Sequence, residues 1–291
     1  MTDWLRDESQ SIAKSGDFFF QEALLSQSSR LENPRYVKRD FVFTSGIWRG
    51  VKQQPLVPSI YRGNVVVGHS DLATGCIALL LMKLSTGGRV YCSNLDCPRA
   101  INAVFGATRM PLGLTNPTSE TSLHPVLGNQ AHIGTVMGEP FVQQKLALYA
   151  NFDSATAPKY RRVVAKRCNS LDYIVKGESD YTPSGRLTYL RQMRDHRLVV
   201  CPRGNGMDTH RFWEALYVGA LPVVLVNSYQ ATLARELRLP FIGLRSWNSL
   251  ADFRDIQRKA EDVLSSDKFS LEGARLSYWE ARIFDTASLS K

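Results

Sequence analysis

Short apolar runs that end in polar turn residues recur through the first half of the chain. They cover residues 40–46, 64–71, 89–96 and 109–116. The segment LATGCIALLLMKLS (residues 72–85) lies between the second and third runs and is long enough for a helix. Strands that alternate with helices predict a parallel sheet, whose ligands bind beyond the carboxyl ends of the strands. Residues 1–38 are polar, and we expect them to be mainly helical.

A second alternating series begins near residue 145, after a stretch of turn composition at residues 115–140. We expect strands at 145–153, 173–177, 197–202, 221–226 and 240–244, with helices at 156–168, 185–196, 210–218, 249–266 and 272–284. The pattern predicts an α/β protein with an N-terminal domain at residues 1–140 and a C-terminal domain at residues 141–272. A last helix within residues 273–291 is placed to cross back onto the first domain.

The amino-acid composition indicates which broad class of protein this is. Hydrophobic residues make up 44% of the 291 residues and charged residues 22%, as in ordinary globular proteins. No apolar run reaches the roughly 18 residues of a membrane helix, and the polar N-terminus does not resemble a signal peptide. We therefore expect a soluble cytoplasmic protein. The five cysteines lack metal-site spacing and are interpreted as buried free thiols of a reducing compartment: Cys76, Cys92, Cys97, Cys168 and Cys201.

The formal net charge of +9 points to an anionic partner, which could be nucleic acid, a membrane surface or a small substrate. The basic residues are scattered, and neither zinc-finger spacing nor an aromatic RNA-binding signature is present. We therefore expect no nucleic-acid partner. Peripheral contact with a membrane is compatible with the charge.

The stretch CPRGNGMDTHRFWEALYVGALPVVL (residues 201–225) concentrates charges between two apolar runs. Gly204 and Gly206 permit close approach of a ligand, Asp208 or Thr209 can cap a helix, and Gly219 can end it. The N-terminus of a helix favours anions, and nearby Arg and His side chains add donors there. The stretch therefore predicts a diphosphate site.

Glu214 lies within this helix, which is apolar nearly all round. A buried carboxylate needs hydrogen-bond partners. The hydroxyl groups of a nucleotide ribose would satisfy it, and so would an ion pair with Arg211 or Arg203. Both interpretations remain open at this point.

The same stretch resembles the donor-site motif of exostosin-like glycosyltransferases (glycosyltransferase family 47). LYANFDSATAPKYRR resembles the first strand and helix of their nucleotide-sugar domain, and VVVGHSD, VYCSNLD, MPLGLTN and LHPVLGN resemble acceptor-side loops. The resemblance covers about residues 40 to 250. It implies the GT-B fold, in which two Rossmann-like domains with parallel sheets face a cleft.

The resemblance also implies roles for particular residues. Arg203 would contact the diphosphate, His210 and Arg211 would line the donor pocket, and Glu214 would hold the ribose. Asn205 and Asp208 would shape the loop or touch the sugar. No two Asp residues are two positions apart, so the Asp-x-Asp metal element of other glycosyltransferases is missing. We therefore expect no metal and no cofactor besides the donor substrate, with protein cations neutralising the leaving UDP.

An inverting transferase needs a base that deprotonates the acceptor hydroxyl. Our first candidates are His69 and Asp71, which follow an apolar run, although Asp71 could instead cap the next helix. Further acceptor-side candidates, each of which could also be a turn residue, are Asn94, Asp96, Asn116 and His124.

These observations predict an inverting, metal-independent glycosyltransferase that moves a sugar from a UDP-sugar to a glycan or glycoprotein hydroxyl. The donor sugar is not determined, and UDP-xylose is the first to consider. A dehydrogenase is disfavoured because the Gly-x-Gly-x-x-Gly fingerprint is missing. The alternative from another class is a non-catalytic module that binds glycan or nucleic acid on a degenerate transferase fold.

Overall fold

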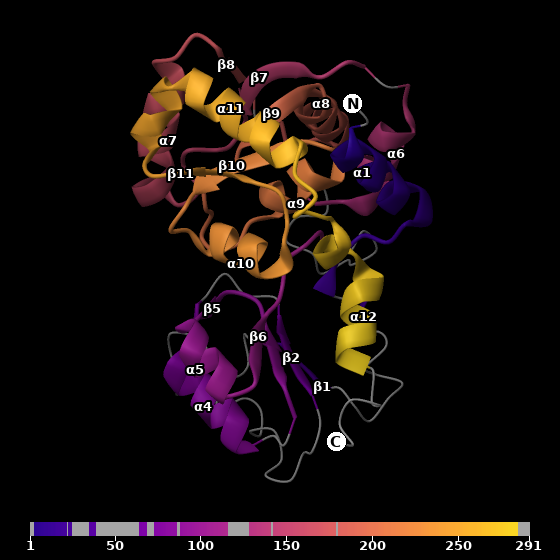
Figure 1. Cartoon of the computed structure of the whole chain (residues 1–291), viewed down its shortest axis with the longest axis vertical. Helices are drawn as coiled ribbons and strands as arrows, with labels where there is room; N and C mark the ends of the chain where they lie inside the picture. Colours follow the sequence, from indigo (N-terminus) through magenta and orange to yellow (C-terminus); the bar gives the residue numbers. More distant parts are fainter. Residues whose placement is uncertain are drawn as a thin grey trace.

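The computed structural model describes residues 3–21, 23–24, 35–38, 64–68, 73–85, 88–115, 128–140, 142–178 and 180–284. These residues form two α/β units, each built on a parallel sheet and placed one above the other in Figure 1. The two parallel sheets agree with the predicted α/β class and with a GT-B-like fold.

The first unit contains a four-stranded sheet in the order β1-β2-β4-β6, with every pair parallel. Helices α4 (Cys76–Ser85) and α5 (Arg99–Val104) lie along the same edge of this unit in Figure 1. A separate parallel pair joins β3 and β5. The strands are β1 (Arg35–Lys38), β2 (Val65–Gly68), β3 (Thr74–Gly75), β4 (Val90–Cys92), β5 (Leu95–Asp96) and β6 (Ala107–Arg109).

The second unit contains a five-stranded parallel sheet in the order β11-β10-β9-β7-β8. Its strands are β7 (Lys145–Ala150), β8 (Ile174–Lys176), β9 (His196–Val200), β10 (Leu221–Leu225) and β11 (Ile242–Leu244). Its helices are α7 (Pro158–Asn169), α8 (Pro183–Arg194), α9 (His210–Tyr217), α10 (Tyr229–Leu237), the 3-10 helix η2 (Trp247–Ala251) and α11 (Phe253–Leu264).

The strand order of the second sheet creates a switch point between β7 and β9. The chain passes from β7 to β8 on one side and then returns to β9 on the other side, from which β10 and β11 continue outward. Ligands of open α/β sheets bind at the carboxyl ends of the strands that flank such a point. The loops after β7 and β9 are therefore the place to look for a site.

Local sequence explains why these helices begin where they do. Pro158 and Pro183 occupy the first turns of α7 and α8, where no backbone N–H is needed. The side chains of Thr182, Ser228 and Asp252 accept hydrogen bonds from the first turns of α8, α10 and α11. These residues fix the starts of α7, α8, α10 and α11.

The N-terminal helix α1 (Trp4–Ser15) packs on the second unit and not on the first. Leu5 and Ile12 belong to the apolar core that surrounds the second sheet. The Ser9 hydroxyl donates to the Leu216 carbonyl of α9 at 2.8 Å, and Asp3 pairs with Arg197 at 2.6 Å. Helix α6 (Gln130–Gly138) also contacts α1 and α8. Both helices fall within the expected N-terminal domain, yet both pack against the C-terminal one.

The C-terminal helix α12 (Leu276–Phe284), which follows the 3-10 helix η3 (Glu272–Ala274), lies beside the first unit in Figure 1. Trp279 is fully buried and packs against Tyr91 of β4, whose hydroxyl donates to the Arg282 carbonyl at 2.9 Å. Asn64 donates to the Ile283 carbonyl at 2.8 Å. The last helix thus returns to the first sheet.

The segments that cross between the units are tied to one another. The Tyr217 hydroxyl accepts from Phe19 N at 3.0 Å and donates to the Ala274 carbonyl at 2.6 Å. Leu114 N donates to the Phe19 carbonyl at 2.9 Å. Gly113 has φ of 67°, and a Cβ there would lie 2.4 Å from that carbonyl oxygen, so this approach needs glycine.

Several predictions of local structure were wrong. Strand β1 lies in the segment expected to be helical, and α6 forms within the stretch read as turns, where Asn129 caps it. Helices α5 and α10 were not predicted. The predicted strand at residues 40–46 lies outside the described residues, and the boundary at residue 140 stays a prediction.

The interpretation of all five cysteines as free thiols was also wrong. Cys76 and Cys97 form a disulfide, with Cα atoms 5.3 Å apart. The register pairs Thr74 with Leu95 and Gly75 with Asp96, so the next residue of each strand comes into apposition. Such bonds are typical of oxidising compartments, so the expected reducing compartment loses its support. The other three cysteines are buried free thiols, as expected: Cys92, Cys168 and Cys201.

The disulfide yields a stability prediction. Replacing Cys76 and Cys97 by serine should lower the free energy of unfolding by about 3 kcal/mol, since the bond closes a loop of 21 residues' separation. Urea unfolding would measure it. Reductant should lower the free energy of unfolding of the native protein to the value of the variant, and it should leave the variant's value unchanged. If reductant has no effect on the native protein, the disulfide does not contribute to stability.

Candidate functional site

The loop at residues 201–209 and helix α9 follow β9 directly, at the switch point. Helix α9 is buried along its whole length after the first turn. Gly219 follows it with φ of 79°, and its N–H donates to the Leu216 carbonyl, which confirms its expected place at the helix end. The side chain of Thr209 precedes the helix without capping it. The start of α9 thus faces the carboxyl ends of β7 and β9.

Three arginines surround this helix start. The Arg203 guanidinium lies over the Tyr160 ring of α7, 4.3 Å from its centroid. Arg211 lies 5.8 Å from the ring centroid of Phe152, just after β7. Arg161 of α7 is buried, and its Nε and Nη1 donate to the carbonyls of Arg203 and Asp153 at 2.9 and 3.2 Å.

Acidic side chains lie near two of these cations without pairing directly with them: Asp153 near Arg161, and Glu214 near Arg211. None of Arg161, Arg203 and Arg211 forms an ion pair with a carboxylate in the part of the chain that the structure describes. Burial, with repulsion from Arg211, lowers the pKa of Arg161 to about 10. The buried Thr209 Oγ1 and Arg211 Nε atoms also lack hydrogen-bond partners among the described residues. The arrangement suits an anion that would accept from several donors.

Glu214 is fully buried and is held by three groups. Its Oε1 accepts from Arg186 of α8 and from Gly128 N, the latter at 3.0 Å, and its Oε2 accepts from the Tyr189 hydroxyl at 3.0 Å. Burial would raise the pKa of Glu214, but the Arg186 charge and its hydrogen bond outweigh burial and hold the pKa below its usual value. The ion-pair partner of Glu214 is thus Arg186, and the alternative ion pair with Arg211 or Arg203 is not formed.

Asp208 is equally buried and joins the loop to the first unit. Its Oδ2 accepts from Leu112 N at 2.9 Å and from Trp213 Nε1 at 3.0 Å, and its Oδ1 accepts from Thr209 N at 2.7 Å. Burial raises the pKa of Asp208 to about 6 against these three donors. The side chain shapes the loop from within, as one of its two expected roles requires.

His210 and Asn94 lie at the same junction. His210 Nδ1 donates to the Gly113 carbonyl at 2.7 Å, since a carbonyl oxygen only accepts. Asn94, with φ of 51°, accepts through Oδ1 from Asp208 N at 2.8 Å. This contact gives Asn94, proposed above as an acceptor-side residue, a second role in holding the donor loop.

The remaining candidates are dispersed. Asn205 is exposed, and its carbonyl accepts from Arg203 at 3.2 Å. Asp96 is exposed on β5, and within the described residues it forms no hydrogen bond or ion pair with the other candidates. The base candidates His69 and Asp71, with Asn116 and His124, lie outside the described residues.

Sequence reasoning missed the buried arginines of α7 and α8. Arg161 shares one helix face with the buried Val164 and Cys168, and Arg186 shares one with Leu190 and Met193. A charged residue on an otherwise buried helical stripe must find partners in the interior. This position in the stripe was the signal by which both could have been found.

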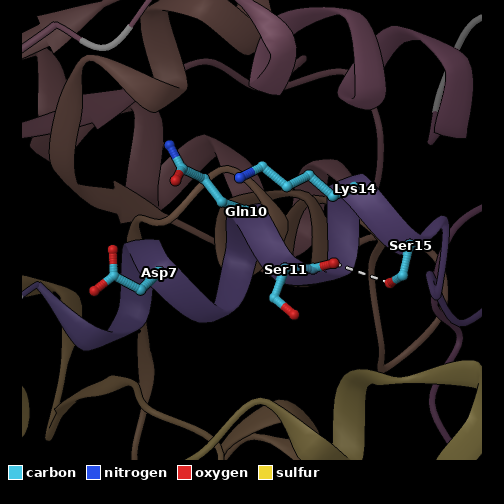
Figure 2. Close-up of a pocket in the computed structure, with 5 residues that line it drawn as sticks. All are labelled: Asp7, Gln10, Ser11, Lys14 and Ser15. Atoms are coloured by element: carbon cyan, nitrogen blue, oxygen red, sulfur yellow. Dashed lines mark hydrogen bonds between the residues drawn. The ribbon is translucent and has the colours of Figure 1, made fainter.

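A surface hollow on α1 lies elsewhere and lacks this chemistry. Figure 2 shows it on the outer face of α1, where Ser15 donates to the Ser11 carbonyl at 2.9 Å. Its lining is Asp7, Gln10, Ser11, Lys14 and Ser15. One acid and one base without a converging set of donors give no reason to place the donor substrate there.

Two features are missing from the described residues. No three His, Cys, Asp or Glu side chains among them come together as a metal-binding group. Among the helices described, none has the length and apolar character to cross a bilayer.

The raised pKa of Asp208 predicts a pH effect. Because the ordinary pKa of Asp is roughly 3.9, the folded state retains this proton as the pH rises and the unfolded state does not. The free energy of unfolding should therefore fall between pH 4 and pH 7, by about 3 kcal/mol from this group. Urea unfolding of the native protein and Asp208→Asn at both pH values isolates the effect. Equal pH slopes for the two proteins would disprove it.

A comparison with protein families completes the description of the site. The family model of the Exostosin GT47 domain matches residues 117–266, just over half of the chain. The match spans α6, the whole second sheet, the three arginines and helix α9. No curated protein sequence matches the chain significantly. The chain belongs to the exostosin GT47 family of glycosyltransferases.

Proposed function

We propose that the protein transfers a sugar from a UDP-sugar to a hydroxyl group of a glycan, with inversion and without a metal ion. The observation that carries the donor site is the set of Arg161, Arg203 and Arg211, three cations without carboxylate partners in the described residues, at the switch point of the second sheet. Family membership supports a nucleotide-sugar donor and a glycan acceptor.

The chemistry assigns one task to the cations. The acceptor oxygen attacks C1 of the sugar from the face opposite the diphosphate, and the bond from C1 to the β-phosphate oxygen breaks. The electron pair leaves with UDP, so negative charge grows on the diphosphate. Arg203 and Arg211 would stabilise this charge through guanidinium N–H groups, which costs little reorganisation because their positions are already set.

Arg161 would act mainly by holding the loop in place. Its Nε and Nη1 donate to the carbonyls of Arg203 and Asp153, so it joins the loops after β7 and β9. A Cβ on Gly204 would lie 3.3 Å from Arg161 Nη2, so a larger residue there would crowd the guanidinium. Its charge adds to the attraction for the diphosphate.

Glu214 would bind the donor directly, and Asp208 would shape the loop that binds it. The Oε2 atom of Glu214 accepts a hydrogen bond from the Tyr189 hydroxyl, and a carboxylate oxygen has room for a second. We keep the ribose as the proposed second partner. The exposed Asn205 at the loop tip is the group proposed to touch the sugar.

Removing the cations should weaken donor binding. Arg203→Ala and Arg211→Ala should each raise the Kd for UDP roughly tenfold to 100-fold, as expected for a lost charge-assisted hydrogen bond. Isothermal titration calorimetry measures this, with and without EDTA. Arg258→Ala, on the exposed side of α11, removes the same charge and should leave the Kd unchanged.

Three outcomes of this experiment would overturn the donor assignment. They are unchanged affinity in both site variants, UDP binding that EDTA abolishes, and preference for GDP, CDP, ADP or NAD over UDP. UDP-xylose is the first sugar donor to compare with UDP itself.

The base belongs to the first unit and is proposed to be Asp71, assisted by His69. Asp71→Asn should leave the Kd for UDP unchanged and lower the transfer rate at least a hundredfold, since general base catalysis contributes roughly that much. The transfer rate is measured in the presence of acceptor as the rate at which UDP is released. Retained transfer in Asp71→Asn would eliminate this residue and direct the same test to His69, Asp96 and His124.

A further inference from the structure

One outward helix face of the first unit is apolar where a soluble protein is ordinarily polar. In α4, Ala78, Leu79 and Met82 pack toward the sheet, while Ile77 and Leu84 are 69% and 75% exposed. Their spacing places both on the side of the helix away from the sheet. The helix contains one cation, Lys83, and no acid.

Helix α5 extends this apolar face. Ile101 packs in the same cluster as α4, and Val104 is 79% exposed. The disulfide between Cys76 and Cys97 ties the first residue of α4 to a residue two positions before α5. We call Ile77, Leu80, Leu84 and Val104 the apolar face. Contiguous exposed apolar side chains of this kind mark an interaction surface.

A second helix on the same edge of the molecule is strongly basic. Helix α7 carries five cations and no acidic residue. Arg161 is buried, whereas Lys159, Arg162 and Lys166 are exposed at i, i+3 and i+7. Val163, 61% exposed, lies among them. We call Lys159, Arg162, Val163 and Lys166 the basic face.

Figure 1 places α7 and the α4–α5 pair along the same long edge of the molecule, one on each unit. Helices α1 and α12 lie toward the opposite edge. The helices that carry the apolar face and the basic face therefore lie along one edge of the protein.

We propose that this edge docks the protein on an anionic lipid bilayer. The exposed side chains of α4 and α5 enter the boundary between headgroups and acyl chains, and the cations of α7 bind the anionic headgroups. Charge complementarity favours this occupant over a second copy of the chain, because two chains of net charge +9 repel each other. Nucleic acid would engage the cations alone and leave the apolar face uncovered.

Vesicle sedimentation of the full chain tests the proposal. The protein should sediment with equimolar phosphatidylcholine–phosphatidylserine vesicles and much less with phosphatidylcholine alone. Lys159→Gln with Lys166→Gln should weaken binding to the anionic vesicles at least about tenfold and remove most of its dependence on salt. The matched control, Lys14→Gln with Arg282→Gln on α1 and α12, should bind as the native protein does.

Ile77→Gln with Leu84→Gln tests the apolar face. Both side chains are exposed, so the fold should persist, and unchanged UDP affinity and thermal midpoint would check this. Binding that survives high salt in the native protein should be lost in this variant. The proposal fails if the native protein ignores anionic vesicles, or if both variants bind as it does. It also fails if light scattering shows a dimer that Ile77→Gln with Leu84→Gln converts to a monomer, since a second copy would then be the occupant.

Discussion

The carboxylate of Asp208 is the point at which the two units are joined to the donor loop. A buried carboxylate must be satisfied by donors from within the protein, because water does not reach it. Asp208 draws these donors from Leu112 of the first unit, from Trp213 of α9 and from the next residue of its own loop. Its own N–H is held by Asn94. Asp208 therefore holds the loop in one position relative to both sheets. The energetic cost is the burial of its carboxylate in an environment that favours the neutral form.

Glu214 has a complementary effect on the charge of the site. By pairing with Arg186 it neutralises a buried arginine, and no carboxylate of the described residues forms an ion pair with Arg161, Arg203 or Arg211. These three cations at the start of α9 are therefore not neutralised by direct ion pairs within the described part of the chain. Removing Glu214 would leave Arg186 buried without its partner, so its contribution to the fold and its contribution to the ribose site need separate measurements.

Much of the second unit could be predicted from sequence, because each of its strands is an apolar run between turn residues. The runs at 197–202 and 221–226 correspond to β9 and β10, and the helix between them begins at His210 as expected. Helix α10 was missed although Ser228 offers a cap before it, and β1 was missed because its four residues resemble the polar segment before it. The disulfide required the register of β3 and β5, which no local pattern contains.

The part of the site that lies in one stretch of sequence was predictable, and the part contributed by other elements was not. A single stretch of sequence contains Arg203, Asp208, His210, Arg211 and Glu214, so their proximity follows from local structure. The hydrogen-bond partners of Glu214 could not be predicted in this way. Arg186 and Tyr189 belong to α8, and Gly128 lies just before α6. Side chains brought together by tertiary packing have no sequence spacing by which to recognise them.

The return of the two chain ends to opposite units has a mechanical consequence. The backbone passes between the units after α1, after β6 and before α12, and Tyr217, Phe19 and Leu114 tie these three passages together. Cutting any one passage would leave the halves attached through the other two. A fragment that begins where the second sheet begins would lack α1, which covers part of that sheet's core. A cut between the two sheets therefore leaves neither sheet with its full set of helices.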